Sequence, residues 1–327
     1  MNTKIVYVLV STPDDVYLEQ CFVSAVSARR HNPEARIVLV TDELTFRSLD
    51  DRGAEGTAFR NLFNEIIPVL LDGSLSAMKR SRMLKTSLRS IVKGDFLYID
   101  TDTVIAGPLG AIDGFDAPLA ACADLHCTFE VHPHRDASIS LCRKIGFDPS
   151  AEEYYFNGGV MLVRESPEAE EFFNEWHRSY LDGFRKGVPQ DQPSLARSNA
   201  ACGHPVHLLP DIWNCQIQNG VRYLKDALVV HYVCTKIASG EEKRLYCLND
   251  PSVFGSLKSV GTLDPALEEV VDDPFKGFAG LTQLFAGEDL YFFRTRRYRA
   301  LRKGFRRGKF SMLEFLLKVR DHLFGRV

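Results

Sequence analysis

The feature that most constrains the fold is an alternation of short apolar runs with longer amphipathic segments through the first two-thirds of the chain. Between two such runs, residues 18, 22, 23 and 26 are apolar with helical spacing, and the HNP at 31–33 stops the helix. Strand, helix and strand in this order predict right-handed βαβ units, and hence an α/β fold with a mostly parallel central sheet. The expected strands are residues 4–10, 36–42, 95–100, 118–124, 158–164 and 227–233.

The length and composition favour one large α/β domain with an appendage. The chain has 327 residues, of which 45% are hydrophobic and 25% charged, as in ordinary globular proteins. Residues 240–280 are charged and rich in turn signals, so we expect a surface region of turns and short helices there. No apolar run reaches 18 residues, and the short run near the N-terminus is typical of a first buried strand rather than a signal peptide.

Charge is distributed unevenly along the chain. Residues 291–327 carry twelve Lys/Arg against two Asp/Glu, a net of +10, so a total of −3 leaves −13 for the rest. Aromatic residues are interleaved with these arginines, and Ser311 and Glu314 form a capping box that opens a helix. This pattern in a basic helical tail, residues 288–327, predicts attachment to an anionic membrane surface. The alternatives are a nucleic-acid patch and a helix packed on the body, but the overall charge does not favour nucleic acid.

The eight cysteines include no C-x-x-C pair, and several lie inside apolar runs. We therefore expect reduced thiols in a cytoplasmic protein. The segment CADLHCTFEVHPHR brings cysteines and histidines together, which raises the possibility of zinc, but no pair has the spacing of a structural zinc site. The residues in question are Cys122, His126, Cys127, His132 and His134.

The stretch FLYIDTD ends an apolar strand with two aspartates, Asp100 and Asp102. Because alternate residues of a strand point the same way, both carboxylates face one volume while Thr101 faces elsewhere. Two carboxylates so close repel each other unless a cation lies between them, and hard oxygen ligands select Mg²⁺ or Mn²⁺, which often hold a phosphate oxygen as well. Ligands of parallel sheets bind beyond the carboxyl ends of the strands, where Thr12 and Asp42 also fall.

Four further stretches follow in order: YYFNGGVMLVR (154–164), PQDQPSLA (189–196), LLPDIWNCQ (208–216) and VVHYVCTK (229–236). Together with the opening segment and the Asp-Thr-Asp strand end, they resemble the retaining, nucleotide-sugar-dependent glycosyltransferases of family 8 over roughly residues 4–240. The resemblance implies a GT-A-type α/β/α sandwich over residues 1–287, with the tail 288–327 appended.

The resemblance also implies roles for individual residues. Asp100, Asp102 and His231 are the implied ligands of Mn²⁺ or Mg²⁺, and the imidazole favours Mn²⁺. Arg82 and Lys85 lie three residues apart on one face of an expected helix, where they either approach the donor phosphate or are simply solvated. The implied donor-binding set is Thr12, Tyr17, Asp42, Arg82, Lys85, Asp100, Thr101, Asp102, Asn157, Gly158 and Lys236. Lys236 is followed by Ile237 and Ala238 where the family has Pro-Trp.

Asp191 and Gln192 fall in the region that the resemblance makes catalytic. In a retaining transfer, either a carboxylate attacks to form a covalent intermediate or the acceptor enters on the leaving group's own face. Gln192 is a weak nucleophile, which favours front-face attack, with Asp191 binding sugar hydroxyls; the alternative for Asp191 is a helix N-cap. Trp213 and Asn214 are candidate acceptor contacts, although core packing suits the tryptophan equally.

The sequence thus predicts a metal-dependent retaining hexosyltransferase that moves glucose or galactose from a UDP-sugar to a saccharide or lipid-linked saccharide. We expect it in the cytoplasm, on the inner face of the plasma membrane, with no nucleic-acid partner. The alternatives are an inverting GT-A transferase and a non-catalytic sugar- or lipid-binding protein on a degenerate GT-A fold.

Overall fold

The computed structural model describes residues 1–217, 223–233, 248, 250–274, 295–298, 300 and 303. Lys236 and nearly all of the tail 288–327 lie outside these residues, so the predictions made for them remain predictions. No helix within the described part of the chain is both long and apolar enough to cross a membrane.

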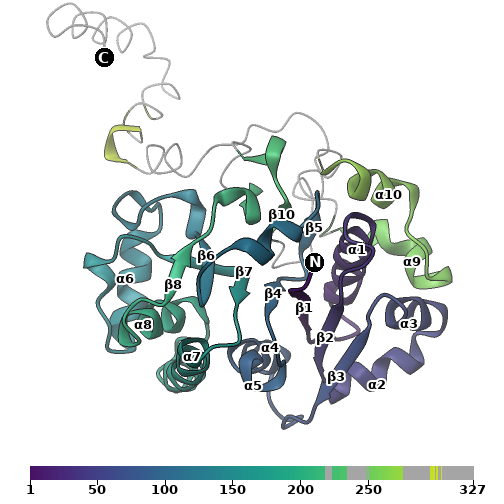
Figure 1. The fold of residues 1–327 in the computed structure, drawn as a ribbon, viewed down its shortest axis with the longest axis horizontal. Coiled ribbons are helices and arrows are strands. Elements are labelled where there is room, and N and C mark those ends of the chain that lie inside the picture. Colours follow the sequence, from purple (N-terminus) through teal and green to yellow (C-terminus); the bar gives the residue numbers. More distant parts are fainter. Residues whose placement is uncertain are drawn as a thin grey trace, which may run out of the picture.

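A seven-stranded sheet forms the centre of the molecule, in the order β3-β2-β1-β4-β7-β6-β8 (Figure 1). Its strands are parallel except for β7, which runs antiparallel to both β4 and β6. The predicted α/β class with a mostly parallel sheet is therefore confirmed. The strands are β1 Lys4–Leu9, β2 Ile37–Asp42, β3 Glu65–Val69, β4 Phe96–Ile99, β6 Leu119–Ala123, β7 Phe156–Val163 and β8 Val206–Leu208.

A second sheet of three short strands, β5 (Thr103–Ile105), β10 (Val229–His231) and β9 (Cys215–Gln216), adjoins the carboxyl end of β4. The strand predicted at 227–233 thus belongs to this small sheet and not to the central one. β10 pairs antiparallel with β5, in a register that sets His231 opposite Thr103. This pairing brings a residue far along the chain next to the aspartates that end β4.

Helices cover both faces of the central sheet (Figure 1). Alternate residues of β1 enter two separate cores: Ile5, Tyr7 and Leu9 pack on the α1 side, and Val6 and Val8 on the α4 side. Coverage of both faces explains why β1 and β4 are apolar at almost every position. The α-helices are α1 Tyr17–His31, α2 Glu43–Asp51, α3 Gly53–Arg60, α4 Ala77–Thr86, α5 Leu88–Ile91, α6 Arg135–Lys144, α7 Pro167–Arg185, α8 Gln192–Ala201, α9 Gly255–Val260 and α10 Pro265–Asp272. Short 3-10 helices are η1 Gly110–Gly114, η2 Asp124–His126, η3 Phe129–Val131, η4 Pro149–Ala151, η5 Asp211–Trp213, η7 Leu224–Asp226 and η10 Pro251–Phe254.

The segment 250–274, expected to be a surface region, is instead partly core. Leu257 of α9 and Leu267 of α10 are fully buried in the cluster that contains β1 and α1. Val270 and Val271 are also buried, so α10 presents apolar residues at the spacing i, i+3 and i+4, which is helical. The turn signals and charges of this segment predicted a surface region, because its apolar periodicity covers too few residues to predict burial.

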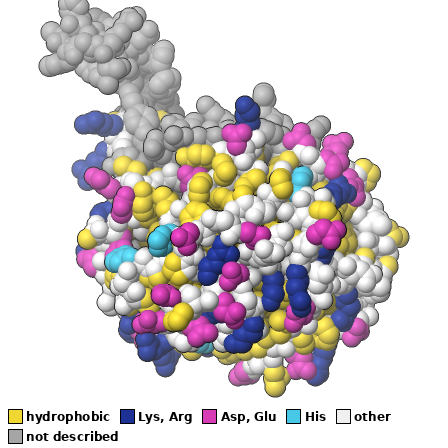
Figure 2. Space-filling model, in the orientation of Figure 1, with side chains coloured by type: hydrophobic (Ala, Val, Ile, Leu, Met, Phe, Trp, Pro, Cys, Tyr) yellow, Lys and Arg dark blue, Asp and Glu magenta, His cyan; other side chains and the backbone are white. Residues whose placement is uncertain are grey.

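Charges of both signs are mixed on the surface. Figure 2 shows basic and acidic side chains interspersed over the face that it presents, rather than gathered into a single-sign field. Nucleic-acid binding surfaces are typically broad and basic, and this face of the body does not have that character.

Candidate active site

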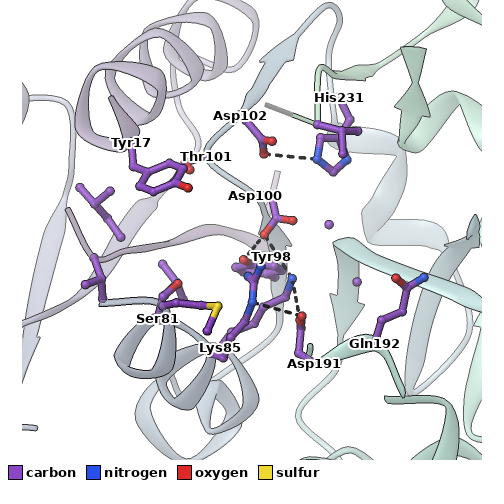
Figure 3. Close-up of a pocket in the computed structure, with 18 of the residues that line it drawn as sticks. Tyr17, Ser81, Lys85, Tyr98, Asp100, Thr101, Asp102, Asp191, Gln192 and His231 are labelled. Carbon is purple, nitrogen blue, oxygen red and sulfur yellow. Dashed lines mark hydrogen bonds and ion pairs between the residues drawn. The ribbon is translucent and has the colours of Figure 1, made fainter. Parts of the chain in front are cut away.

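A cavity of about 270 Å³ opens at the carboxyl edge of the central sheet, beside β1, β4 and α4 (Figure 3). Most of the residues predicted to form a site lie in its wall, although they come from six separate segments of the chain. The predicted residues that line it are Tyr17, Arg82, Lys85, Asp100, Thr101, Asp102, Asn157, Gly158, Asp191, Gln192 and His231.

The reversed direction of β7 is what brings two of the predicted segments together. Because β7 is antiparallel to β4, its beginning lies beside the end of β4. The Asp100 backbone N–H donates to the Gly159 carbonyl at 2.7 Å. Asn157 and Gly158 are thereby held beside the aspartates.

Asp100, Asp102 and His231 form a cluster whose ligand atoms lie within 4.8 Å of one another. His231 Nε2 is 3.2 Å from Asp102 Oδ1, and its Nδ1 lies 2.9 Å from the Asn214 side-chain oxygen. That oxygen can only accept, so Nδ1 carries the hydrogen, and the Nε2 lone pair of a neutral ring faces a carboxylate. Such an arrangement requires a cation or a proton between the two groups. The donor set therefore fits a divalent metal ion.

The same electrostatics appear in the pKa of His231. Burial lowers this pKa, but the Asp102 carboxylate, with Asp100 behind it, raises it by more, and the net shift is upward. The field at Nε2 thus favours positive charge.

A second group of charges lies across the cavity from the imidazole. Arg82 Nε and Lys85 Nζ, both on α4, lie 3.2 and 3.3 Å from the two oxygens of Asp191. Lys85 Nζ also donates to Asp100 Oδ1 at 3.2 Å, which links this group to the metal cluster. Burial opposes ionisation of Asp191, but Arg82 and Lys85 outweigh it and lower its pKa to about 2. Asp191 is therefore a carboxylate at neutral pH.

Asp191 occupies the N-cap position of α8, yet its side chain makes no capping hydrogen bond. The capping alternative considered from the sequence is therefore wrong, because the carboxylate faces the two cations of α4. Gln192 donates from Nε2 to the Phe156 carbonyl at 3.1 Å. With its amide nitrogen held there, the Gln192 oxygen lies on the cavity side (Figure 3).

Four of the predicted contacts do not line the cavity. Asp42 is 1% exposed; it caps α2 through the Thr45 N–H and pairs with Arg80 at 2.5 Å. Thr12 donates its backbone N–H and its hydroxyl to Asp15. These strand-end residues therefore hold neighbouring loops, and neither of them lines the cavity.

Trp213 and Asn214, predicted to contact the acceptor, are both buried. Trp213 packs in the large core cluster that also contains the buried residues of α1, so the core-packing alternative holds for it. Asn214 is fully buried and bonds the side chains of Asn157 and His231. It supports the site from behind and does not form its wall.

Two residues at this edge of the sheet, Tyr98 and Asp124, were not predicted from the sequence. Tyr98 lines the cavity, and its hydroxyl donates to Asp100. It precedes Asp100 by two residues on the same strand, so strand alternation would have found it. Asp124 follows β6 directly, at the same edge of the sheet as Asp100, so the strand-end rule that predicted Asp100 applies to it as well.

That segment does not assemble a zinc site. His132 Nε2 lies 2.9 Å from Asp124, and His126 Nε2 lies 2.9 Å from the Asn214 carbonyl, so the histidines have other partners. Among the described residues, Asp100, Asp102 and His231 are the group of His, Cys, Asp and Glu with the geometry to hold a metal. None of the six described cysteines is in a disulfide, consistent with the predicted reduced thiols.

The mostly parallel sheet, with a small second sheet at its carboxyl edge, is the arrangement of a GT-A-type glycosyltransferase fold. The bifunctional glycosyltransferase WbbM, solved in its apo form, matches with a TM-score of 0.50 and 18% identity. The match covers 71% of this chain and 45% of WbbM, so the chain corresponds to less than half of that protein's length.

Two further solved glycosyltransferases are similar. The galactosyltransferase LgtC, in complex with donor and acceptor sugar analogs, has a TM-score of 0.48 and 20% identity over 71% of this chain and 87% of its own. Mouse xyloside xylosyltransferase 1 has a TM-score of 0.48 and 14% identity over 72% of this chain and 98% of its own. No protein-family model and no curated protein matches the sequence. The resemblance to family 8 glycosyltransferases is confirmed at the level of the fold.

Proposed function

We propose that this protein is a metal-dependent retaining glycosyltransferase that moves glucose or galactose from a UDP-sugar to a saccharide or lipid-linked saccharide. The observation that carries the proposal is the meeting of Asp100, Asp102 and His231 with Arg82, Lys85 and Asp191 in one cavity. The side of the cavity with the two aspartates and the histidine suits a metal cation, and the side formed by α4 carries the arginine and lysine cations. A nucleotide diphosphate attached to a sugar has the complementary charges.

The metal site and α4 would share the donor diphosphate. A Mn²⁺ or Mg²⁺ ion held by Asp100, Asp102 and His231 would offset the charge that develops on the departing diphosphate. Lys85 and Arg82 contribute fixed positive charge on the opposite side, and Tyr17 and Thr101 line the cavity where the nucleoside would lie. Lys236 remains a candidate diphosphate contact from the sequence alone.

The sugar would lie against α8 and the start of β7. Asp191, ionised and held by Arg82 and Lys85, suits hydrogen bonding to sugar hydroxyls better than nucleophilic attack, because both its oxygens are engaged by cations. The Gln192 carbonyl stabilises positive charge at the anomeric carbon without forming a bond. These roles favour front-face transfer, in which an oxygen of the leaving diphosphate takes the acceptor's proton.

Membrane attachment through the basic tail, at the cytoplasmic face, belongs to the proposal on sequence grounds. It explains why an acidic body carries a strongly basic, aromatic end, and it suits a lipid-linked acceptor. Sedimentation with anionic vesicles tests it: binding that disappears at high salt supports attachment, and no binding at low salt contradicts it.

Calorimetric titration of UDP into the protein, with and without Mn²⁺, tests the central assignment. We expect binding that requires the metal and is lost in the double variant Asp100→Asn/Asp102→Asn. Binding of UDP that is indifferent to metal and to both substitutions, or no binding of UDP, contradicts the UDP-sugar assignment. Slow hydrolysis of UDP-glucose or UDP-galactose in the absence of an acceptor separates an enzyme from a non-catalytic binding protein.

A further inference from the structure

A continuous line of hydrogen-bonded side chains runs from the loop before α6 to the metal cluster. His132 bonds Asp124 at 2.9 Å, Asp124 bonds Asn157 at 2.8 Å, and Asn157 bonds Asn214 at 2.9 Å. Asn214 bonds His231 at 2.9 Å. Four of these five side chains belong to residues that are at least nine-tenths buried, the exception being Asn157 at the cavity wall.

The direction of every hydrogen bond in this line follows from its outer end. The His134 backbone N–H donates to His132 Nδ1 at 3.1 Å, so the hydrogen of a neutral His132 ring is on Nε2. Nε2 donates it to Asp124, whose carboxylate can only accept. The other carboxylate oxygen therefore receives the amide N–H of Asn157 and fixes which way that amide is turned.

The orientation of the Asn157 amide in turn determines the hydrogen bonds as far as the metal ligand. With its nitrogen at Asp124, Asn157 presents its oxygen to the Gly159 backbone N–H at 2.9 Å and to the Asn214 nitrogen. Asn214 must then turn its own oxygen to His231, so Nδ1 of that ring donates. Nε2 of His231 is left with its lone pair toward Asp102.

We propose that His132, Asp124, Asn157 and Asn214 are positioning residues that fix the tautomer and ring orientation of His231 for metal binding. The inference rests on the proposed function, since it assigns a role in building the metal site. Asp124 determines the direction, because it is the member that accepts on both sides. Partners of this kind behind a metal-binding histidine typically contribute 10- to 100-fold to metal affinity.

The isosteric variant Asp124→Asn is the sharpest test of direction. Asp124 also accepts a hydrogen bond from the Gln192 side chain. An asparagine at 124 must place its amide nitrogen where one of the two carboxylate oxygens was, and His132, Asn157 and Gln192 all present N–H groups to this position. Facing Asn157, it would force that amide to turn its nitrogen toward the Gly159 N–H and the Asn214 nitrogen. In every arrangement two N–H donors face each other at some point in the chain of hydrogen bonds, while the shape of the site is unchanged.

Two measurements report on His231 directly, without any glycosyl transfer. Nitrogen-15 spectra of the histidine rings in metal-free protein at mildly alkaline pH, assigned with His231→Gln, identify which ring nitrogen carries hydrogen. We expect the hydrogen on Nδ1 in the wild type and a mixture of tautomers in Asp124→Asn. Calorimetry with Mn²⁺ should show affinity reduced about tenfold or more in the variant.

A second substitution should remove the unfavourable contact between two N–H donors. His132→Gln places an amide that can turn its oxygen toward the new nitrogen in Asp124→Asn/His132→Gln, so the remaining bonds recover their original direction. We expect this double variant to bind Mn²⁺ more tightly than Asp124→Asn. A general loss of stability would not be repaired in this way.

Asp113→Asn is the matched control. It makes the same atomic change at a carboxylate that accepts the Asn2 and Thr3 backbone N–H groups, at 2.7 and 2.9 Å, before the start of β1. It should lose stability but keep the His231 tautomer and the Mn²⁺ affinity.

The inference is overturned if wild-type His231 carries its hydrogen on Nε2, which needs no variant to establish. It is also overturned if Asp124→Asn binds Mn²⁺ as tightly as the wild type. Failure of the wild type itself to bind Mn²⁺ would instead contradict the proposed function, so the two failures are distinguishable.

Discussion

At the scale of single residues, two adjacent glycines at the start of β7 have very different surroundings. A Cβ atom added at Gly158 would meet Leu195 and Lys85 side-chain atoms at 3.4–3.6 Å, which is ordinary contact. A Cβ at Gly159 would lie 2.8 Å from His231 Nδ1 and 2.9 Å from the Asn157 side-chain oxygen. Only the second glycine is required for the close approach of β7 to the metal ligand.

Gly159→Ala should therefore displace the His231 ring, and Gly158→Ala should not. We expect Mn²⁺ affinity to fall by about tenfold or more in Gly159→Ala, as when a partner of a metal ligand is lost. Calorimetry on both variants measures this, with thermal unfolding to show that each is folded. Equal affinities in the two variants would mean that the site tolerates the shift of His231.

The strand-end rule accounts for what the sequence predicted correctly at this scale. It found Asp100 and Asp102, because a strand that ends in two aspartates with one residue between them is visible locally. The rule could not separate these ligands from Asp42, which also follows a strand. The Asp42 carboxylate pairs with Arg80 and caps α2. Whether a strand-end carboxylate faces a ligand or a neighbouring arginine depends on contacts between distant segments, which local sequence does not specify.

At the scale of elements, the central strands were predictable and their pairing was not. The apolar runs of β1, β2, β4, β6 and β7 predicted strands, but an apolar run carries no sign of direction, so the reversal of β7 had no local signal. β8 and β9 are three and two residues long, and they draw their stability from pairing with β6 and β10. Such short strands are products of the tertiary structure.

The tightness with which α9 packs on α3 can be tested by substituting two glycines. Gly261 ends α9 with φ of +73°, and a Cβ there would lie 2.7 Å from the Ala54 carbonyl oxygen and 2.9 Å from the Ala58 Cβ. Gly203, just after α8, has φ of +77° and open space around it. Gly203→Ala should cost about 1 kcal/mol for the left-handed conformation alone.

Gly261→Ala has the same conformational cost, and its added methyl group must also push α9 away from α3. We expect its free energy of unfolding in urea to fall by at least about 1 kcal/mol more than that of Gly203→Ala. Its Mn²⁺ affinity should stay at the wild-type value, because α9 lies away from the cavity. Equal destabilisation by the two substitutions would show that α9 is not tightly packed and would support the surface region expected from the sequence.

At the scale of the whole molecule, the site brings together two helices, α4 and α8, that lie far apart in the sequence. α4 precedes the metal strand, whereas α8 follows β7, and the ion pairs of Arg82 and Lys85 with Asp191 connect the two helices across the cavity. Burying Lys85 and Asp191 beside the half-buried Arg82 costs desolvation energy that the attraction among the three charges must offset. Stability should therefore depend on the ionisation of Asp191.

The sign of this dependence follows from the pKa of Asp191, which is lowered in the folded state from its ordinary 3.8 to about 2. The unfolded chain binds a proton at Asp191 more readily than the folded one, so the stabilisation is fully present above about pH 4 and is lost as the pH falls toward 2. The shift corresponds to about 2 kcal/mol at neutral pH. Urea unfolding of the wild type and Asp191→Asn across this range isolates the contribution, because the other carboxylates titrate alike in both proteins. The difference in unfolding free energy between them should shrink by about that amount toward pH 2, whereas a constant difference would mean that the Asp191 carboxylate gains nothing from Arg82 and Lys85.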